Sequence, residues 1–378
     1  MRTRREFLID SMKGACASCI ASGLFLAGSC SVLMAREKDE KKYTKEAMYY
    51  EKKEEMKILC KLCPRECSVA DLERGYCGVR ENRGGIYYTL VHSRPCTYHV
   101  DPIEKKPFFH FLPGSTAFSI ATAGCNVECR FCQNWDISQF RPEQLESIYM
   151  PPETVHAMAK KSGARSIAYT YSEPVVFYEY VLDTARLGPE TGIRSVVVSN
   201  GYIQEKAIIE LCQHLGAIKI DLKAFTEKFY REVCNGKLEP VLKTLLAIKK
   251  TGIWFEIVVL IIPTLNDSEI ELRKMSRWIR ENLGPDVPVH FTRFHPTYKI
   301  KNLPRTPLPV LERARDTARS EGLNFVYMGN VPGHESENTI CPSCKNTIIK
   351  RYGYLIMNMD IANGKCGKCA RTIPGVWS

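Results

Sequence analysis

Short runs of β-branched and apolar residues alternate along this chain with longer stretches in which apolar residues recur at helical spacing. The runs predict strands at residues 117–123, 166–171, 194–199, 217–222, 254–262, 287–294 and 324–328. The stretches between them predict helices at 152–161, 175–187, 205–215, 238–251, 268–282 and 308–321. Near-continuous apolar strands joined by helices form a parallel sheet covered by helices. We therefore predict an α/β fold, a full or partial TIM-like (β/α) barrel, over residues 114–334.

The composition sets the size of the core and limits the partners. With 378 residues, 44% of them hydrophobic and 25% charged, the chain can build one large or two smaller cores, which excludes disorder and a small disulfide scaffold. The net charge of +11 comes from 53 basic and 42 acidic residues. No long basic block stands out, so we expect no nucleic-acid partner; an acidic electron-donor protein or an anionic substrate would suit the charge.

The first 35 residues have the pattern of a targeting segment. Arg4 and Arg5 precede a small and apolar run at 14–35, which predicts a twin-arginine export signal. The run is also long enough to remain as a membrane anchor, and Cys30 closes an imperfect lipobox at which a lipid could be attached. The location stays open, because the chemistry inferred below suits the cytoplasm. Residues 36–57 mix both charges and predict a solvated linker or a surface helix.

Seventeen cysteines are more than a chain of this size needs for covalent stability, and their spacing indicates metal ligands. In the segment 58–113 four of them form one predicted metal site, zinc or iron–sulfur, with Cys96 to spare: Cys60, Cys63, Cys67 and Cys77. In the segment 335–378 two Cys-x2-Cys pairs joined by a predicted hairpin indicate a structural zinc ribbon: Cys341, Cys344, Cys366 and Cys369. We expect Cys16, Cys19, Cys212 and Cys234 to be buried fillers.

A third cysteine set follows the first predicted strand of the barrel. Cys125, Cys129 and Cys132 have the spacing Cys-x3-Cys-x2-Cys. Three thiolates on one loop can hold three corners of a 4Fe–4S cluster and leave the fourth iron open to the amino and carboxylate groups of S-adenosylmethionine (SAM). A partial zinc site is the alternative, and it would need a fourth ligand nearby.

At this triplet, with Phe131 before the last cysteine, the chain resembles the radical SAM superfamily. Within it, the chain is most similar to the radical enzymes of the AmmeMemoRadiSam system, which are related to the pyruvate formate-lyase activating enzymes. The resemblance runs from Cys60 to Trp377. It includes the strings Asp101-Pro-Ile-Glu-Lys-Lys-Pro107, Tyr169-Thr-Tyr-Ser-Glu-Pro174, Asp221-Leu-Lys223 and Gly329-Asn-Val-Pro-Gly-His334.

The resemblance implies roles for polar residues at the strand ends. Glu173 stands where related enzymes have Gly-Gly-Glu-Pro and bind the amino group of SAM, although Tyr171 and Ser172 replace the two glycines. We assign SAM binding to Glu173, Ser199, Asn200, Asp221, Lys223 and His295. Each has a simpler alternative: a surface carboxylate, a turn, a salt bridge in the barrel mouth or a hydrogen-bonded core histidine. His290, His110 and His334 are further candidates near the site.

The resemblance also implies the reaction. An electron enters the cluster and cleaves SAM to methionine and a 5'-deoxyadenosyl radical, which abstracts hydrogen from an unidentified substrate. Expected partners are an electron donor such as flavodoxin or ferredoxin, together with Memo-like and AMMECR1-like pathway proteins. The alternatives are a glycyl-radical-enzyme activase, which uses the same chemistry on a protein, and a non-catalytic iron–sulfur electron carrier, which would place a fourth cysteine ligand on the central cluster.

Overall fold

The computed structural model describes residues 40–378, of which Lys45–Ser378 form one compact unit. The export signal or anchor at 1–35, with Cys16, Cys19 and the lipobox Cys30, lies outside the described residues. Among the helices of residues 40–378, none combines the length and apolar character needed to cross a bilayer.

The centre of this unit is an eight-stranded sheet with the order β14-β13-β12-β11-β10-β9-β8-β7. All neighbouring strands from β8 to β14 run parallel, while β7 pairs antiparallel with β8. The strands are β7 (Thr97–Pro102), β8 (Thr116–Ala121), β9 (Ser166–Tyr169), β10 (Arg194–Ser199), β11 (Ala217–Asp221), β12 (Trp254–Ile261), β13 (Val289–Arg293) and β14 (Val326–Gly329). The seven parallel strands are those expected from the apolar runs.

Closure of the barrel is not shown. Within residues 40–378 no strand pairing joins β14 to β7, so the sheet has two free edges and matches the predicted barrel only in its partial form. The sequence pattern did not predict β7, because three of its six residues are exposed and the strand reads as polar. It belongs to the segment that we expected to be a separate Cys-rich region.

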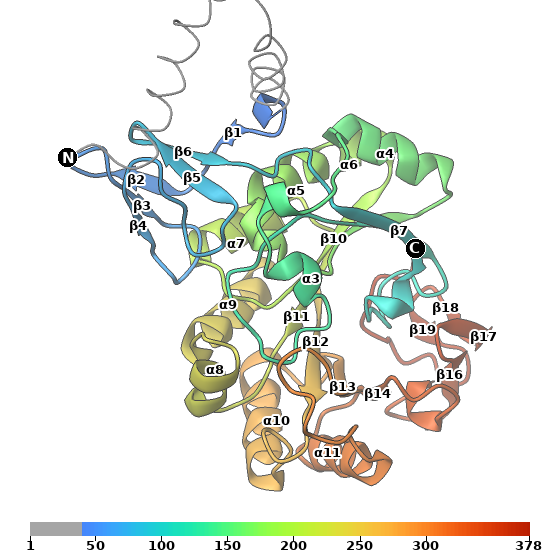
Figure 1. The fold of residues 1–378 in the computed structure, drawn as a ribbon. Coiled ribbons are helices and arrows are strands. Elements are labelled where there is room, and N and C mark those ends of the chain that lie inside the picture. The colour runs from blue at the N-terminus through green and yellow to red at the C-terminus, as the bar shows by residue number, and fades with distance from the viewer. Residues whose placement is uncertain (1–39) are drawn as a thin grey trace, which may run out of the picture. The chain divides into compact units, whose positions relative to one another are not determined.

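Helices follow the strands at the predicted places. They are α4 (Pro152–Lys161), α5 (Tyr178–Arg186), α7 (Glu205–Cys212), α9 (Leu238–Thr251), α10 (Glu269–Leu283) and α11 (Leu308–Ser320), with the shorter α3 (Trp135–Ser138), α6 (Gly188–Thr191) and α8 (Glu227–Val233). The Ser268 side chain caps α10 by accepting from the Glu271 amide. Figure 1 shows α4 and α5 beside the β8–β10 end of the sheet, and α10 and α11 beside the β13–β14 end.

An aromatic segment fills the inner face of the sheet near the amino ends of its strands. Phe108 and Phe111 are fully buried and pack against Ala117, Ala168 and other inward residues of β8 to β11. This packing leaves the carboxyl ends of the strands as the open side of the layer. In parallel α/β folds that side carries the chemistry.

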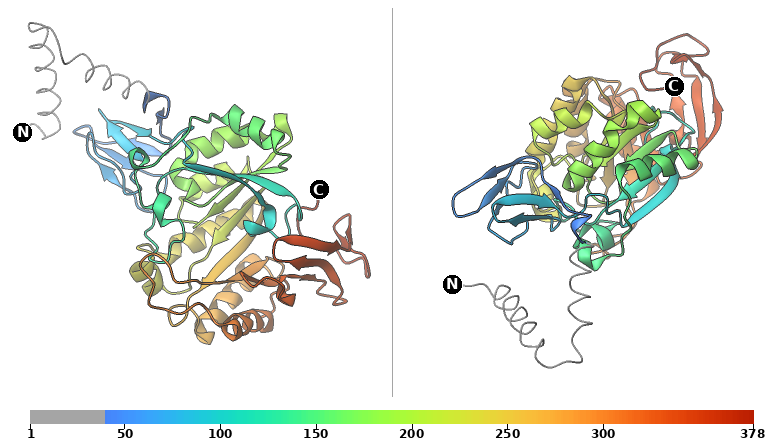
Figure 2. Two further views of the ribbon diagram at one scale, coloured as in Figure 1. Left: turned by 45° about the vertical axis from the view of Figure 1, so that its right-hand side comes forward. Right: turned by 90° about the horizontal axis from the view of Figure 1, so that it is seen from above.

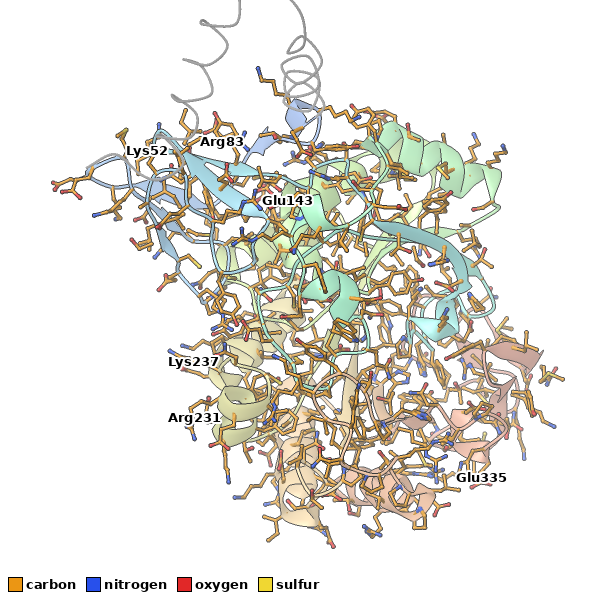
Figure 3. All side chains as sticks on the ribbon, viewed as in Figure 1. Lys52, Arg83, Glu143, Arg231, Lys237 and Glu335 are labelled. Carbon is orange, nitrogen blue, oxygen red and sulfur yellow. The ribbon has the colours of Figure 1, made fainter. Side chains whose placement is uncertain are left out.

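Part of the predicted charged linker is instead folded. Residues 45–57 contribute β1 (Lys45–Glu46), which pairs with β6 (Ile86–Thr89), and β2 (Tyr50–Lys52), which pairs with β3 (Ile58–Cys60). The two small sheets are completed by β4 (Ser68–Val69) and β5 (Arg80–Arg83). The charged side chains of β1 and β2 face solvent, whereas Ala47 packs in the core, so the charge pattern alone resembled a linker. Figure 3 shows Lys52 and Arg83 pointing outward from this region.

The C-terminal segment folds as the predicted ribbon. It contains β15 (Thr339–Ile340), β16 (Thr347–Tyr352), β17 (Leu355–Met359), β18 (Ile361–Ala362) and β19 (Lys365–Cys366). The β16–β17 hairpin turns at Gly353, whose φ of +59° favours glycine. Ile348 and Ile373 pack with Phe325 and Tyr327 of the β14 region, which fixes the ribbon beside that strand. Figure 2 shows this hairpin next to the β13–β14 side of the sheet.

Candidate functional site

A cavity of about 520 Å³ opens at the carboxyl ends of the parallel strands. Its lining includes the three central cysteines, the ends of β9 to β14 and part of the ribbon. The structure therefore brings together residues that are far apart in the chain. The predicted residues that line it are Cys125, Cys129, Cys132, Glu173, Ser199, Asn200, Asp221 and Lys223.

The cysteine triplet lies on the loop directly after β8. Gly124 enters this loop with φ of +96°, and a Cβ there would stand 2.8 Å from the Cys77 carbonyl oxygen, so only glycine fits. Burial raises the pKa of Cys125 well above its usual value and that of Cys132 to about 11. Such thiols become thiolates only when a metal or cluster compensates the charge.

The sulfur spacing of the triplet suits a cluster better than a single ion. Four sulfurs on one zinc lie about 3.8 Å apart, given Zn–S bonds of about 2.3 Å. The three central sulfurs do not all lie within 4.8 Å of one another; in residues 40–378 only the ribbon quartet meets that condition. Three thiols facing one roomy cavity are thus a donor set that fits three corners of a 4Fe–4S cluster.

Cys234 is buried next to the cysteine loop, in agreement with the predicted filler role. Its carbonyl oxygen accepts from the Glu128 amide at 2.9 Å, and the Val233 carbonyl oxygen accepts from the Arg130 amide at 2.9 Å. The nearby Cys234 thiol is the main cause that lowers the pKa of Cys129. Cys234 is 1% exposed and does not belong to the described lining of the cavity, so it supports the loop from behind.

Glu173 is held between the ends of β9 and β10. Its Oε1 accepts from Ser199 Oγ at 2.7 Å and from the Val175 amide at 3.1 Å, and its Oε2 accepts from the Asn200 amide at 2.8 Å. Burial raises the pKa of Glu173 to about 7, against these hydrogen bonds. The carboxylate is fixed in the cavity wall rather than displayed on the surface.

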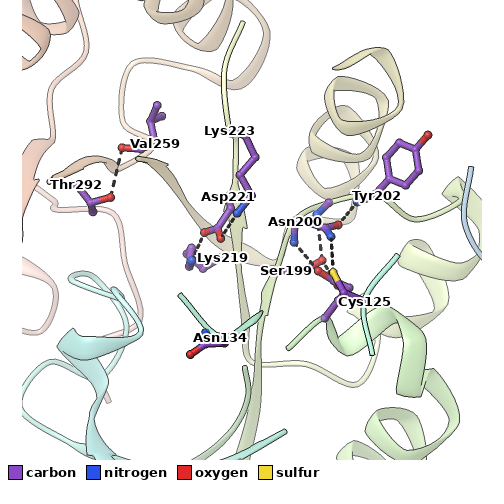
Figure 4. A network of polar contacts seen from close by, with 12 residues as sticks. Cys125, Asn134, Ser199, Asn200, Tyr202, Lys219, Asp221, Lys223, Val259 and Thr292 are labelled. Carbon is purple, nitrogen blue, oxygen red and sulfur yellow. Dashed lines mark hydrogen bonds and ion pairs between the residues drawn. The ribbon is translucent and has the colours of Figure 1, made fainter. Parts of the chain in front are cut away.

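Asn200 connects this carboxylate to the cysteine loop. Its Nδ2 donates to Asn126 Oδ1 at 2.9 Å and lies 3.9 Å from Cys125 Sγ, as Figure 4 shows for Cys125 and Asn200. Its Oδ1 accepts from the Tyr202 amide at 2.8 Å. The Ser199-Asn200-Gly201 sequence is thus both a turn and a wall of the cavity, so the two readings of it are compatible.

Tyr171 has a left-handed backbone although it is not a glycine. Its φ is +66°, in the left-handed region, which costs an ordinary residue about 1 to 2 kcal/mol. Two polar contacts hold the side chain: the Tyr171 hydroxyl donates to Asp101, and Lys106 Nζ donates to the hydroxyl at 3.1 Å. Asn134 Nδ2 donates to the Tyr171 carbonyl at 3.0 Å. A left-handed tyrosine, fixed by these contacts, therefore precedes Ser172 and Glu173 in the cavity wall.

Asp221 lies between two lysines at the end of β11. Lys223 Nζ donates to Asp221 Oδ2 at 2.7 Å, and Lys219 donates to Oδ1. Figure 4 shows Asp221 with Lys219 on one side and Lys223 on the other. Desolvation raises the pKa of Asp221, but the two ammonium groups outweigh it and lower the pKa to about 2. The three groups carry a net positive charge into the cavity, which suits a carboxylate.

The structure places the four candidate histidines differently from the prediction. His295, assigned to SAM binding, is absent from the described cavity lining, so the geometry gives that role no support. His290 does line the cavity, and its Nε2 is 2.7 Å from Glu256 Oε2. His110 is fully buried, 2.6 Å from the Tyr327 hydroxyl, and burial lowers its pKa to about 4. His334 accepts from the Ser336 amide and caps a turn before the ribbon.

Several lining residues were not singled out from the sequence. Lys219, Asp221 and Lys223 are alternate residues of one extended segment and share a face, so the sequence could have indicated Lys219 as a lining residue. Glu104 and Lys106 come from the segment before β8, and Glu337 and Tyr354 come from the ribbon. Glu104 and Lys106 lie in the string from Asp101 to Pro107 that carries part of the resemblance, but only packing brings it to the cavity, and nothing local marks Glu337 or Tyr354.

The two outer cysteine sets differ in geometry. In the ribbon, Cys341 Sγ is 3.6 Å from Cys369 Sγ and Cys344 Sγ is 3.7 Å from Cys366 Sγ, close to the spacing around one tetrahedral ion. All four ribbon sulfurs lie within 4.8 Å of one another and could hold a metal ion. Cys60, Cys63, Cys67 and Cys77 line one small cavity of their own.

Comparisons with known proteins show which proteins this chain is similar to. Residues 119–275 match the radical SAM superfamily. The chain is 44% identical over 331 residues to the uncharacterized protein MJ0808 of Methanocaldococcus jannaschii, covering 87% of this chain and 98% of that protein. It is 22% identical over 160 residues to the pyruvate formate-lyase-activating enzyme of Clostridium pasteurianum, covering 42% and 66% of the two chains. The Streptococcus suis SuiB structure aligns with a TM-score of 0.45 and 13% identity, over 60% of this chain and 52% of that one.

Proposed function

Because this chain belongs to the radical SAM superfamily, whose domain implies a 4Fe–4S cluster and SAM, we propose that it is an enzyme that abstracts hydrogen from a substrate bound in the 520 Å³ cavity. One observation carries the proposal: Cys125, Cys129 and Cys132 share this cavity with the polar ends of β9, β10 and β11. When bound, the cluster supplies the electron that splits SAM into methionine and a 5'-deoxyadenosyl radical.

The chain's own residues bind the cluster and orient SAM beside it. Cys125, Cys129 and Cys132 hold three irons, and the open side of the triplet faces the cavity. Glu173 accepts from the amino group of SAM, and the positive side of the Asp221–Lys223 pair attracts its carboxylate. Asn200 keeps its amide beside Cys125 and presents polar atoms at the same wall.

The walls of the cavity determine what else can enter. Gly353 and Tyr354 of the ribbon hairpin and Asn330 after β14 also line the cavity. These segments limit the size of a substrate that can reach the cysteine loop. An activase would have to admit a loop of another protein past the hairpin, so we rank that alternative second.

The test is anaerobic reconstitution followed by measurement of 5'-deoxyadenosine with reductant and SAM. We expect product from the wild-type protein and none from Cys129→Ala, with Cys212→Ala as a matched buried-cysteine control that retains product. Cleavage of SAM at the wild-type rate by reconstituted Cys129→Ala would refute the proposal. Absence of 5'-deoxyadenosine from the reconstituted wild-type protein would also refute it and would favour the electron-carrier alternative.

The narrower assignments are also proposals. Motifs such as Gly329-Asn330-Val331-Pro332-Gly333-His334 support membership in an AmmeMemoRadiSam system, with Memo-like and AMMECR1-like proteins as pathway partners and flavodoxin or ferredoxin as electron donor. A pull-down from cells with the tagged full chain tests the partners. Recovery of neither pathway protein under anaerobic conditions would argue against the system assignment.

A further inference from the structure

Four cysteines of the N-terminal segment gather around one small cavity. Cys60 ends β3, and Cys63, Cys67 and Cys77 follow on the loops before β5. None of the four forms a disulfide. All four side chains line this cavity, which places the four thiols near one another.

The spacing of these sulfurs separates a cluster from a single ion. The ribbon quartet, within 4.8 Å, has zinc geometry. No three of the N-terminal sulfurs come that close, and the same holds for the radical SAM triplet. In a 4Fe–4S cube each thiolate binds a different iron, so the sulfurs stand further apart than around one ion, and the N-terminal set lacks the close spacing of the ribbon quartet.

A backbone hydrogen-bond donor contacts one of these sulfurs. The amide of Tyr76 donates to Cys67 Sγ at 3.4 Å. Donors aimed at cysteine sulfurs are the usual means by which a protein stabilises the charge of an iron–sulfur cluster.

A buried arginine with one unpartnered nitrogen also lines the cavity. Arg80 is 1% exposed; its terminal nitrogens donate to Glu179 at 2.7 and 3.1 Å and to the Met48 carbonyl at 3.0 Å. Its Nε has no hydrogen-bond partner. A buried donor of this kind is costly unless something accepts from it, and a thiolate or sulfide in the cavity would do so.

The N-terminal cysteines adjoin the catalytic loop. Gly124, next to Cys125, packs so closely on Cys77 that a Cβ would stand 2.8 Å from its carbonyl oxygen. Asn126, on the other side of Cys125, lines the N-terminal cavity together with Val175 and Val176, which follow Glu173 and Pro174. The two cysteine sets are thus separated by one layer of backbone.

We propose that Cys60, Cys63, Cys67 and Cys77 bind a second 4Fe–4S cluster, fully ligated by cysteine, that passes electrons to the cluster at Cys125, Cys129 and Cys132. With four thiolate ligands it has no open iron and cannot hold SAM. It accepts one electron from a low-potential donor protein and gives that electron to the catalytic cluster, so it returns to its oxidised state and no bond is made or broken. The transfer step rests on the proposed function; the binding site does not.

The experiment uses the full chain with Cys125→Ala, Cys129→Ala and Cys132→Ala combined, reconstituted anaerobically. We expect about four iron atoms per chain and a dithionite-reduced electron paramagnetic resonance signal that SAM leaves unchanged. Cys344→Ala with Cys369→Ala should remove zinc and leave this signal. The N-terminal variant Cys67→Ser should alter the signal, whereas Cys96→Ala, in the same segment, should not. Zinc in place of iron, or no metal, in the triple variant would overturn the proposal.

The outcomes keep the two proposals apart. Wild-type cleavage of SAM together with an iron-free triple variant would defeat the second cluster alone. An iron-containing triple variant without wild-type cleavage would defeat the proposed function alone. For the transfer step, Cys67→Ser should slow reduction of the catalytic cluster by flavodoxin at least tenfold, as followed by its SAM-dependent signal; reduction at the wild-type rate would overturn that step.

Discussion

Ser199 Oγ donates a 2.7 Å hydrogen bond to Glu173 Oε1, which ties the end of β10 to the loop after β9. Both residues line the cavity, and the Glu173 carboxylate also accepts two backbone amides. Together with the two amides, this hydrogen bond fixes the orientation of the Glu173 carboxylate. It links the predicted SAM site to two neighbouring strands at once.

Glu173→Gln should weaken SAM binding. The amide has no negative charge to offer the SAM ammonium group, so we expect Kd to rise at least tenfold, or about 1.4 kcal/mol. Ser199→Ala should raise it only a few-fold, since the carboxylate stays and loses one positioning bond. Equilibrium binding to the reconstituted protein measures both. Glu335→Gln, an exposed carboxylate that Figure 3 shows at the periphery, is the control and should leave Kd unchanged.

Glu104 should make stability depend on pH. It is 1% exposed, its Oε2 has no hydrogen-bond partner, and burial raises its pKa to about 7. The folded protein then holds a proton that the unfolded chain releases above its ordinary pKa near 4.5, so this contribution to stability is lost as pH rises from about 4.5 to 7. At pH 8 the free energy of unfolding of Glu104→Gln should exceed that of the wild type by up to about 3 kcal/mol, and at pH 4.5 it should not. Urea unfolding of the apoprotein at both pH values measures this difference. An equal effect at both pH values would contradict the raised pKa of Glu104.

Tyr171 offers a test of stored backbone strain. Tyr171→Phe keeps the left-handed residue but loses the contacts with Asp101 and Lys106, so we expect a loss of about 1 to 2 kcal/mol in the free energy of unfolding. Tyr171→Gly loses the same contacts but relieves the backbone, and should be more stable than Tyr171→Phe by about 1 kcal/mol. Chemical denaturation of the two variants makes the comparison. The reverse order would show that φ at this position carries no strain.

Loss of metal from the ribbon should disturb the cavity that the ribbon lines. Ile348 and Ile373 hold the ribbon against Phe325 and Tyr327, while Gly353 and Tyr354 line the cavity. Cys344→Ser should therefore release zinc and increase proteolysis within 335–378. It should also increase uncoupled 5'-deoxyadenosine formation, because water and solvent reductants can enter. Cys212→Ala controls for loss of a thiol; an intact ribbon with no bound metal in the wild type would contradict the zinc assignment.

The sequence by itself determined the order and type of the main elements. The apolar runs at 194–199 and 217–222 became β10 and β11 almost residue for residue, because buried parallel strands must be apolar on both faces. The spacing of Cys125, Cys129 and Cys132 likewise predicts a cluster on the central loop, since ligands on one short loop can reach one cluster whatever surrounds them.

Only the tertiary structure decided what shares the cavity with that loop. Glu104, Lys219 and Tyr354 come from three separate segments; alternation along β11 places Lys219 beside Asp221, whereas no local pattern places Glu104 or Tyr354 at this cavity. Packing also decided that His290 lines the cavity, that His295 is absent from its described lining, and that Cys234 lies behind Cys129. Strand periodicity and ligand spacing are short-range properties and can be read from the chain, whereas contacts between distant segments depend on the whole set of packed elements.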